Sequence, residues 1–229
     1  MSLSLINAAT GRRVRFTPRQ VLLAGYTGRD RIAVQRHIDE LAEQGIPPPP
    51  EVPVVYPGAE LQVDGELPAS IGWSSGEVEF VLLVTRSGTF VGVGSDHTDR
   101  ELERTDMIPA KQAFPKIVGG TVWPLETLLP FWDELVLDSW LSRGQRRRQY
   151  QEGPLAEILR PEDLLNLINP GMRGPGLALF SGTVPALRPP PRTGHWRFQG
   201  ELVTADGRAL SRCQYEYRAG PVRAHGEME

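Results

Sequence analysis

The stretch WSSGEVEFVLLVTRSGTFVGVGSDHTDRELE, residues 73–103, predicts a β-hairpin that carries acidic residues on one face. The run 77–85 is rich in the β-branched and aromatic residues that favour strands. Residues 87–88, Ser-Gly, form a two-residue turn of the kind found in hairpins, and 90–94 runs back as the second strand.

The register of this hairpin brings three carboxylates together. A symmetric turn pairs Thr85 with Phe90 and Glu79 with Asp96, and Glu77 shares their face because strand side chains alternate. Directly opposed Cβ atoms lie about 5 Å apart, and like charges at that distance destabilise the pair unless a cation neutralises them or one carboxyl keeps its proton.

A solvated acidic strand face is the alternative interpretation. Val81 and Leu83 continue the acidic face, while Val78, Phe80 and Leu82 occupy the other, so both faces are expected to be covered. Covered carboxylates need a partner. Oxygen ligands without cysteine or paired histidine suit a hard cation, Mg²⁺ first with Mn²⁺ or Ca²⁺ as alternatives, better than structural zinc.

These acidic residues also carry a family resemblance. Glu77-Val-Glu79 followed by SDHTDRELE at 95–103 resembles the metal-binding pattern of the fumarylacetoacetate hydrolase superfamily, a Glu-x-Glu strand and then an Asn-Asp-x-Ser-x-Arg-Asp-x-Gln segment. The resemblance implies Glu77, Glu79 and Asp96 as Mg²⁺ ligands.

Two positions depart from that pattern. Ser95 stands where the superfamily has Asn, and Glu103 stands where it has the Gln that contacts substrate. Arg100 matches and is implied as a substrate-binding residue. The likeness is to an uncharacterised bacterial branch of the superfamily, a family without an assigned function.

Residues 30–44 predict a helix, which ends at Gly45 and the prolines at 47–50. His37 and Glu40 lie three residues apart on one face of it, where the carboxylate can fix the imidazole tautomer; a surface ion pair is the alternative. From His37 onward the sequence resembles the superfamily's mobile lid, His-x-x-Glu followed by Pro-rich sequence. The resemblance implies that this pair activates water.

Lysine is rare in this chain. Of 25 basic residues only Lys111 and Lys116 are lysines, and both follow the acidic hairpin. Codon bias is one explanation, and a need for a compact ammonium beside an acidic site is the other. Lys111 matches a Gly-Lys segment of the superfamily, which implies that it stabilises a developing enolate.

Two later segments extend the resemblance. The region 150–168 matches a superfamily segment with a Gln and a Leu-Ile helix, and 177–185 resembles its Thr-Gly-Thr-Pro turn. The resemblance implies Gln151, Gly182 and Thr183 as substrate-binding residues. A plain strand and turn is the alternative for Gly182 and Thr183.

Elsewhere the sequence predicts short strands, one long helix and a second hairpin. Strands are expected at 13–16 and 20–24, and a loop or short strand at 106–120. Apolar residues at helical spacing predict a helix over 124–143. The region 195–218 predicts a hairpin with aromatic pairs across its strands.

Bulk composition indicates an ordinary globular protein of 229 residues with a net charge of −3. The charge gives no reason to expect nucleic acid or an acidic membrane as a partner, even though 143–148, RGQRRR, is basic. One cysteine, Cys213, excludes an internal disulfide and fits a cytoplasmic location. No apolar run is long enough for a membrane helix.

Together these features predict a mostly β, α+β chain with a fumarylacetoacetate hydrolase-like β-roll or sandwich and short helices. Residues 1–70 form an N-terminal segment with the lid, and 71–229 the catalytic β-roll. The resemblance implies a Mg²⁺-dependent, homodimeric hydrolase that cleaves a carbon-carbon bond in a 2,4-dioxo acid. Alternatives are an oxo-acid decarboxylase, hydratase or tautomerase on the same site, and a non-catalytic metal- or ligand-binding protein.

Overall fold

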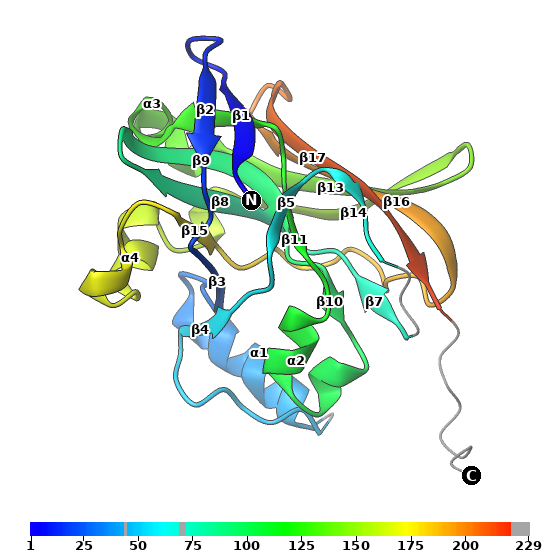
Figure 1. Cartoon of the computed structure of the whole chain (residues 1–229). Helices are drawn as coiled ribbons and strands as arrows, with labels where there is room; N and C mark the ends of the chain where they lie inside the picture. The colour runs from blue at the N-terminus through cyan, green and yellow to red at the C-terminus, as the bar shows by residue number, and fades with distance from the viewer. Residues whose placement is uncertain (44, 69–71, 221–229) are drawn as a thin grey trace.

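Two large β-sheets with short helices around them form the part of the chain that the computed structural model describes, residues 1–43, 45–68 and 72–220 (Figure 1). The larger sheet has ten strands, and β11 (Lys116–Val118) joins β9 to β5 (Leu61–Val63) beside its main path. In spatial order the main path is β2 (Arg13–Phe16), β1 (Leu3–Asn7), β12 (Thr121–Pro124), β9 (Gly88–Ser95), β8 (Val78–Thr85), β15 (Leu177–Phe180), β3 (Gln20–Gly25) and β4 (Val54–Pro57).

The second sheet has five strands and packs against the first. Its order is β14 (Arg146–Pro154), β13 (Val136–Arg143), β16 (Gly194–Val203), β17 (Ala209–Ala219) and β6 (Gly65–Glu66). A small pair, β7 (Ser74–Ser75) and β10 (Thr98–Asp99), lies beside them. The predicted mostly β, α+β class is confirmed.

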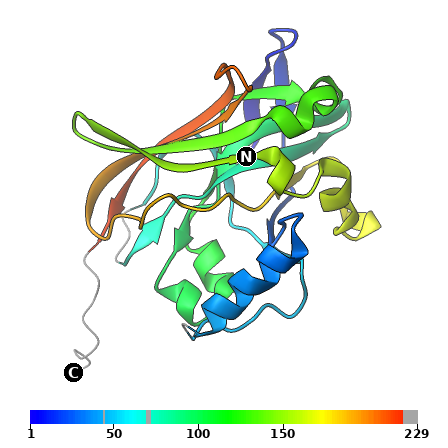
Figure 2. The ribbon, with the colours of Figure 1, turned by 180° about the vertical axis from the view of Figure 1, so that it is seen from behind.

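The helices are short. In both views α1 and α2 lie next to each other on one side of the sheets (Figures 1 and 2). The helices are α1 (Arg31–Glu43), α2 (Met107–Gln112), α3 (Leu125–Leu128) and α4 (Pro161–Asn166), with 3₁₀ turns η1 (Leu102–Arg104), η2 (Leu129–Glu134), η3 (Leu155–Glu157) and η4 (Pro170–Met172). The helix predicted at 30–44 is confirmed as α1, while Gln44 lies outside the described residues.

Strand β8 separates two hydrophobic cores. Phe80 and Leu82 belong to the core between the two sheets. Val81 and Leu83 belong to a second core, whose members come from strands as distant as β2 and β3 of the ten-stranded sheet, so that sheet curls around it. Both faces of β8 are therefore covered, as the sequence predicts, and Glu79 points to the same side as the second core.

The hairpin register differs by two residues from the predicted one. Thr85 pairs with Gly88 instead of Phe90, and Glu79 pairs with Gly94 instead of Asp96. The turn is made by Arg86 and Ser87 because the Thr85 hydroxyl accepts from the Ser87 N–H and donates to the Gly88 carbonyl, at 3.1 and 2.7 Å. Gly88 follows the turn with a φ of 127°, which only glycine adopts readily. Because side chains alternate along a strand, a register shift of two residues leaves every side chain on the predicted face of the sheet.

The helix predicted at 124–143 is wrong. The segment contains the short α3 and η2 and then strand β13, with a break at Phe131, where φ is −128° and ψ 25°. Buried and partly exposed residues alternate along β13, and hydrogen bonds to β14 and β16 on both sides outweigh the helical spacing. The apolar residues Leu128, Trp132 and Leu135 are nevertheless buried core residues.

Residues 106–120 also differ from prediction, because Lys111 lies on helix α2. The Asp106 carboxylate accepts from the Ile108 N–H at 3.0 Å and caps the helix, and Pro109 is tolerated because it lies in the first turn. The expected short strand is present after the helix as β11.

Other expectations agree with the structure. Strands β2 and β3 match the two predicted early strands, and β16 and β17 form the predicted second hairpin, with Trp196 opposite Tyr217 and Phe198 opposite Tyr215. The predicted boundary at 70/71 lies outside the described residues. Strands from both sides of it share one sheet, since β1 pairs with β12 and β3 with β15. Within the described ranges, no helix has the length and apolar character to span a membrane.

Candidate active site

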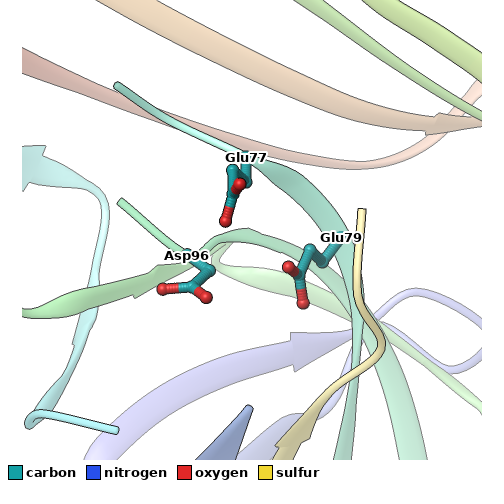
Figure 3. Close-up of side chains that lie close together, drawn as sticks. All are labelled: Glu77, Glu79 and Asp96. Atoms are coloured by element: carbon teal, nitrogen blue, oxygen red, sulfur yellow. The ribbon is translucent and has the colours of Figure 1, made fainter. Parts of the chain in front are cut away.

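Three carboxylates lie close together at the end of the β8–β9 hairpin (Figure 3). Glu77 precedes β8, Glu79 lies in it, and Asp96 follows β9, where its N–H donates to the Glu77 carbonyl at 3.0 Å. One oxygen from each carboxyl group lies within 4.8 Å of the others. The strand alternation predicted from the sequence therefore brings the three side chains to one place.

Lys111 places its ammonium group between two of these carboxylates. Its Nζ lies 2.7 Å from Glu77 Oε2 and 2.7 Å from Asp96 Oδ2, and it donates to Thr98 Oγ1 at 3.1 Å. All three ammonium hydrogens therefore have acceptors. Burial would lower the pKa of Lys111, but Asp96 and Glu77 raise it above its ordinary value, so the lysine stays charged.

Lys116 holds Asp96 from the other side. Its fully buried ammonium group lies 2.6 Å from Asp96 Oδ1 and donates to the His97 carbonyl at 2.7 Å. Both lysines of the chain thus contact the same carboxylate, which accords with a need for compact ammonium groups. His97 is also fully buried, and its Nδ1 lies 2.9 Å from the Tyr215 hydroxyl.

Arg100 links Glu77 to Glu103. Its Nη2 lies 2.8 Å from Glu77 Oε1 and its Nη1 lies 2.7 Å from Glu103 Oε2, while Nε donates to Ser75 Oγ at 2.7 Å. All three charged side chains are largely buried, with 13 to 19% of each side chain exposed. The glutamate that departs from the family pattern is therefore the partner of the arginine that matches it.

The two glutamates of the cluster have opposite protonation preferences. Burial opposes ionisation of Glu77, but Arg100 and Lys111 hold its pKa well below its ordinary range. Burial raises the pKa of Glu79 well above its ordinary range, and the charges of Asp96 and Glu77 raise it further. Glu79 is the member of the cluster that lacks a cationic partner among the described residues.

A tight turn after β15 orients Glu79. Gly182 donates its N–H to Glu79 Oε2 at 2.9 Å and has a φ of 83°. A Cβ at this position would lie 2.3 Å from Thr27 Oγ1, so the turn needs glycine. The predicted substrate-binding N–H of Gly182 thus already has an acceptor.

Gln151 and Thr183 likewise have partners inside the chain. The Thr183 hydroxyl donates to the Val78 carbonyl and accepts from Gln151 Nε2, both at 2.7 Å. Gln151 is buried, and its Oε1 accepts from the Val78 N–H at 3.0 Å. Gln151 holds the start of β8 and does not reach the cavity, whereas Thr183 lines it.

The acidic cluster lies in the wall of a cavity of about 860 Å³. Arg100, Glu103 and Lys111 line the same cavity, as does His37 from α1. Glu40 is not among the lining residues. Its Oε2 lies 4.0 Å from His37 Nδ1, and the two side chains are 59 and 61% exposed. The structure therefore brings His37 to the cavity, with a weak link to Glu40.

The donor set fits a divalent cation. All three side chains offer carboxylate oxygens, the ligands that Mg²⁺, Mn²⁺ and Ca²⁺ prefer. The deeply buried Glu79 carboxyl accepts the Gly182 N–H and has no cation beside it in the described chain, so a divalent ion held here would supply the positive charge that this carboxyl lacks.

Sequence reasoning missed several cavity residues. Tyr26 and Tyr56 line the cavity, and burial raises the pKa of Tyr56 to about 12. Tyr26 has a φ of 56°, which no sequence pattern signals. Arg29 also lines the cavity and pairs with Asp133 at 2.6 Å. These residues come from loops and strands that only tertiary pairing places beside the hairpin.

Comparison with known proteins identifies a family and a fold. The model of a family described as "Protein of unknown function (DUF2848)" matches residues 24–215. A search of curated proteins finds no match. Among solved structures, a candidate fumarylacetoacetate isomerase/hydrolase from Oleispira antarctica is 18% identical with a TM-score of 0.61, covering 93% of this chain and 98% of that one.

Two further structures have the same fold. A candidate fumarylpyruvate hydrolase from Burkholderia cenocepacia is 18% identical with a TM-score of 0.58, over 96% of this chain and 92% of that one. A 2-keto-3-deoxy-D-arabinonate dehydratase, complexed with magnesium and 2,5-dioxopentanoate, is 15% identical with a TM-score of 0.62, over 88 and 73%. The fold and the uncharacterised branch expected from the resemblance are confirmed.

Proposed function

This chain belongs to the DUF2848 family, and we propose that it is a divalent-metal-dependent enzyme acting on a 2-oxo or 2,4-dioxo acid. The observation that carries the proposal is the buried cluster of Glu77, Glu79 and Asp96 in the wall of a large cavity. Arg100, Lys111 and Lys116 pair with Glu77 and Asp96 but, among the described residues, leave Glu79 without a cation. A metal held by the cluster would supply that charge and, because it would face the cavity, could also contact a substrate.

Each neighbouring residue has a role in this proposal. When bound by the three carboxylates, a divalent cation supplies a Lewis acid for the oxygens of the 2-oxo acid. Lys111 keeps a fixed positive charge at the same wall, where it stabilises negative charge that develops on the substrate. Lys116 and the Gly182 N–H hold Asp96 and Glu79 in place.

Hydrolytic carbon-carbon cleavage is the favoured reaction. Water adds to the 4-oxo carbon, the bond between carbons 3 and 4 breaks, and its electron pair enters the enolate of the 2-oxo acid, which then takes a proton at carbon 3. His37, on α1 in the cavity wall, accepts the proton of the attacking water.

Among proteins with the same fold, some support hydrolysis and others support a lyase reaction. They include a candidate fumarylpyruvate hydrolase and a dehydratase complexed with magnesium and 2,5-dioxopentanoate. Turnover of acylpyruvates, oxaloacetate and 3-deoxy-2-oxo sugar acids, with Mg²⁺ present and after chelation, distinguishes the reactions. Turnover of none of them would favour a metal- or ligand-binding protein instead.

Replacing His37 with Ala is expected to lower kcat at least tenfold while the melting temperature changes by less than about 2 °C, because the side chain is exposed and its link to Glu40 is weak. Arg36→Ala is the matched control, since Arg36 is an exposed neighbour on α1 that does not line the cavity. Normal turnover by His37→Ala would remove His37 from the mechanism.

A further inference from the structure

The cations of the cavity all have carboxylate partners within the chain. Three cationic side chains line it, Arg29, Arg100 and Lys111. Arg29 pairs with Asp133, Arg100 with Glu77 and Glu103, and Lys111 with Glu77 and Asp96. Among the described lining residues, no positive charge is left without a negative partner.

Carboxylic side chains outnumber these cations in the lining. There are six of them: Asp30, Glu77, Glu79, Asp96, Glu103 and Glu157. A divalent cation would take up the charge of the metal-binding cluster, but Glu103 lies outside that cluster. A second carboxylate on a bound substrate would therefore enter a lining that contains the Glu103 carboxylate and, in the described part of the chain, offers no available cation.

The remaining lining is largely uncharged. Helix α1 turns Val34 and Leu41 to the cavity, on either side of His37, and Met107, Ile158 and Val184 line it from other elements. The phenol groups of Tyr26 and Tyr56 supply neutral polar atoms in the lining. These walls suit an alkyl or aryl group, with at most neutral polar substituents.

We propose that the substrate is a 2-oxo acid whose distal part carries no second carboxylate, and that Glu103 is the residue that enforces this choice. The proposal rests on the proposed function, because the shared 2-oxo acid end is held at the metal cluster. Glu103 acts in two ways: its own charge repels a distal carboxylate, and it occupies Nη1 of Arg100, which would otherwise be free to bind one.

Two ligands of equal length test this choice. In 2-oxohexanoate the chain ends in a methyl group, and in 2-oxoadipate a carboxylate replaces it. We expect the Mg²⁺-loaded protein to bind 2-oxohexanoate at least tenfold more tightly, as measured by calorimetry. Equal affinity, or tighter binding of 2-oxoadipate, would overturn the proposal.

Variants assign the effect to Glu103. Glu103→Gln removes the negative charge and replaces the charged partner of Arg100 Nη1 with a neutral amide oxygen, so the ratio of the two affinities should fall to about threefold or less. Glu157→Gln is the matched control, because it removes an equal charge from an exposed lining residue and should leave the ratio unchanged. An equal fall in both variants would contradict the role of Glu103.

Oxalate separates this inference from the proposed function, since it carries only the metal-binding end. Binding of oxalate together with poor discrimination between the two oxo acids would reject the specificity alone. A Mg²⁺-loaded protein that binds neither oxalate nor either oxo acid would reject the proposed function, and the specificity with it.

Discussion

Glu79→Gln is expected to make the metal-free protein more stable and to abolish its stabilisation by Mg²⁺. The glutamine carbonyl can still accept the Gly182 N–H, and its amide can donate to the neighbouring carboxylates. Because a glutamine neither buries a charge nor takes up a proton on folding, the substitution should raise the free energy of unfolding by about 2 kcal/mol near pH 8. In a chain of this size that raises the melting temperature by about 4 to 8 °C.

The raised pKa of Glu79 also predicts how the stability of the metal-free protein changes with pH. Because the pKa of Glu79 is raised on folding, the folded protein holds a proton that the unfolded chain has lost, so metal-free stability falls as pH rises from about 4.5 through the folded pKa. The lowered pKa of Glu77 acts in the opposite direction, and its stabilisation is lost only as pH falls below about 4.5. Thermal melts of Glu79→Gln should lack the first dependence.

With Mg²⁺ present, wild type is expected to become more stable than Glu79→Gln. At a hundredfold excess over its Kd, the ion should stabilise wild type by about 2.7 kcal/mol, and it should leave Glu79→Gln unchanged. Glu134→Gln is the control, because Glu134 is an exposed glutamate that does not line the cavity. A Glu79→Gln protein that binds Mg²⁺ as tightly as wild type would contradict the metal site.

Lys111→Arg is expected to lower kcat/KM roughly 30- to 1,000-fold. This corresponds to a loss of about 2 to 4 kcal/mol of transition-state stabilisation. The ammonium of Lys111 fits between Glu77 and Asp96 with all three hydrogens accepted. A guanidinium group is broader and planar, so it keeps the charge without reproducing that position. The measurement is steady-state turnover of the best acylpyruvate with Mg²⁺ present.

Binding separates a catalytic role of Lys111 from a structural one. Lys111→Arg should still bind Mg²⁺ and oxalate within about threefold of wild type, and its circular dichroism spectrum should be unchanged. Lys111→Met, which leaves Glu77 and Asp96 with one cation fewer, should instead destabilise the metal-free protein by about 3 to 5 kcal/mol. Equal turnover by wild type and Lys111→Arg would remove Lys111 from the chemistry.

The carboxylate cluster could be predicted from the sequence because strand periodicity is insensitive to a register shift of two. The predicted pairing of Glu79 with Asp96 was wrong, yet Glu77, Glu79 and Asp96 still share a face. The partner of Arg100 could not be predicted in the same way. It depends on the turn η1, which brings Glu103 back to the guanidinium.

The error over residues 124–143 has a tertiary cause. The spacing of the apolar residues in this segment is compatible with a helix, but β13 gains hydrogen bonds on both edges. One partner, β16, is distant in sequence, and the other, β14, pairs only because of the turn that joins it to β13. The local sequence does not contain that information. The second hairpin was predicted correctly, with Phe198 opposite Tyr215, because its turn and its pairing are local.

A crystal structure of the protein with Mg²⁺ and oxalate is the decisive test of the metal site. We expect one ion bound by Glu77, Glu79 and Asp96 at about 2.0 to 2.1 Å, with oxalate completing its coordination inside the cavity. An ion bound elsewhere, or no ion on these carboxylates at saturating Mg²⁺, would contradict it.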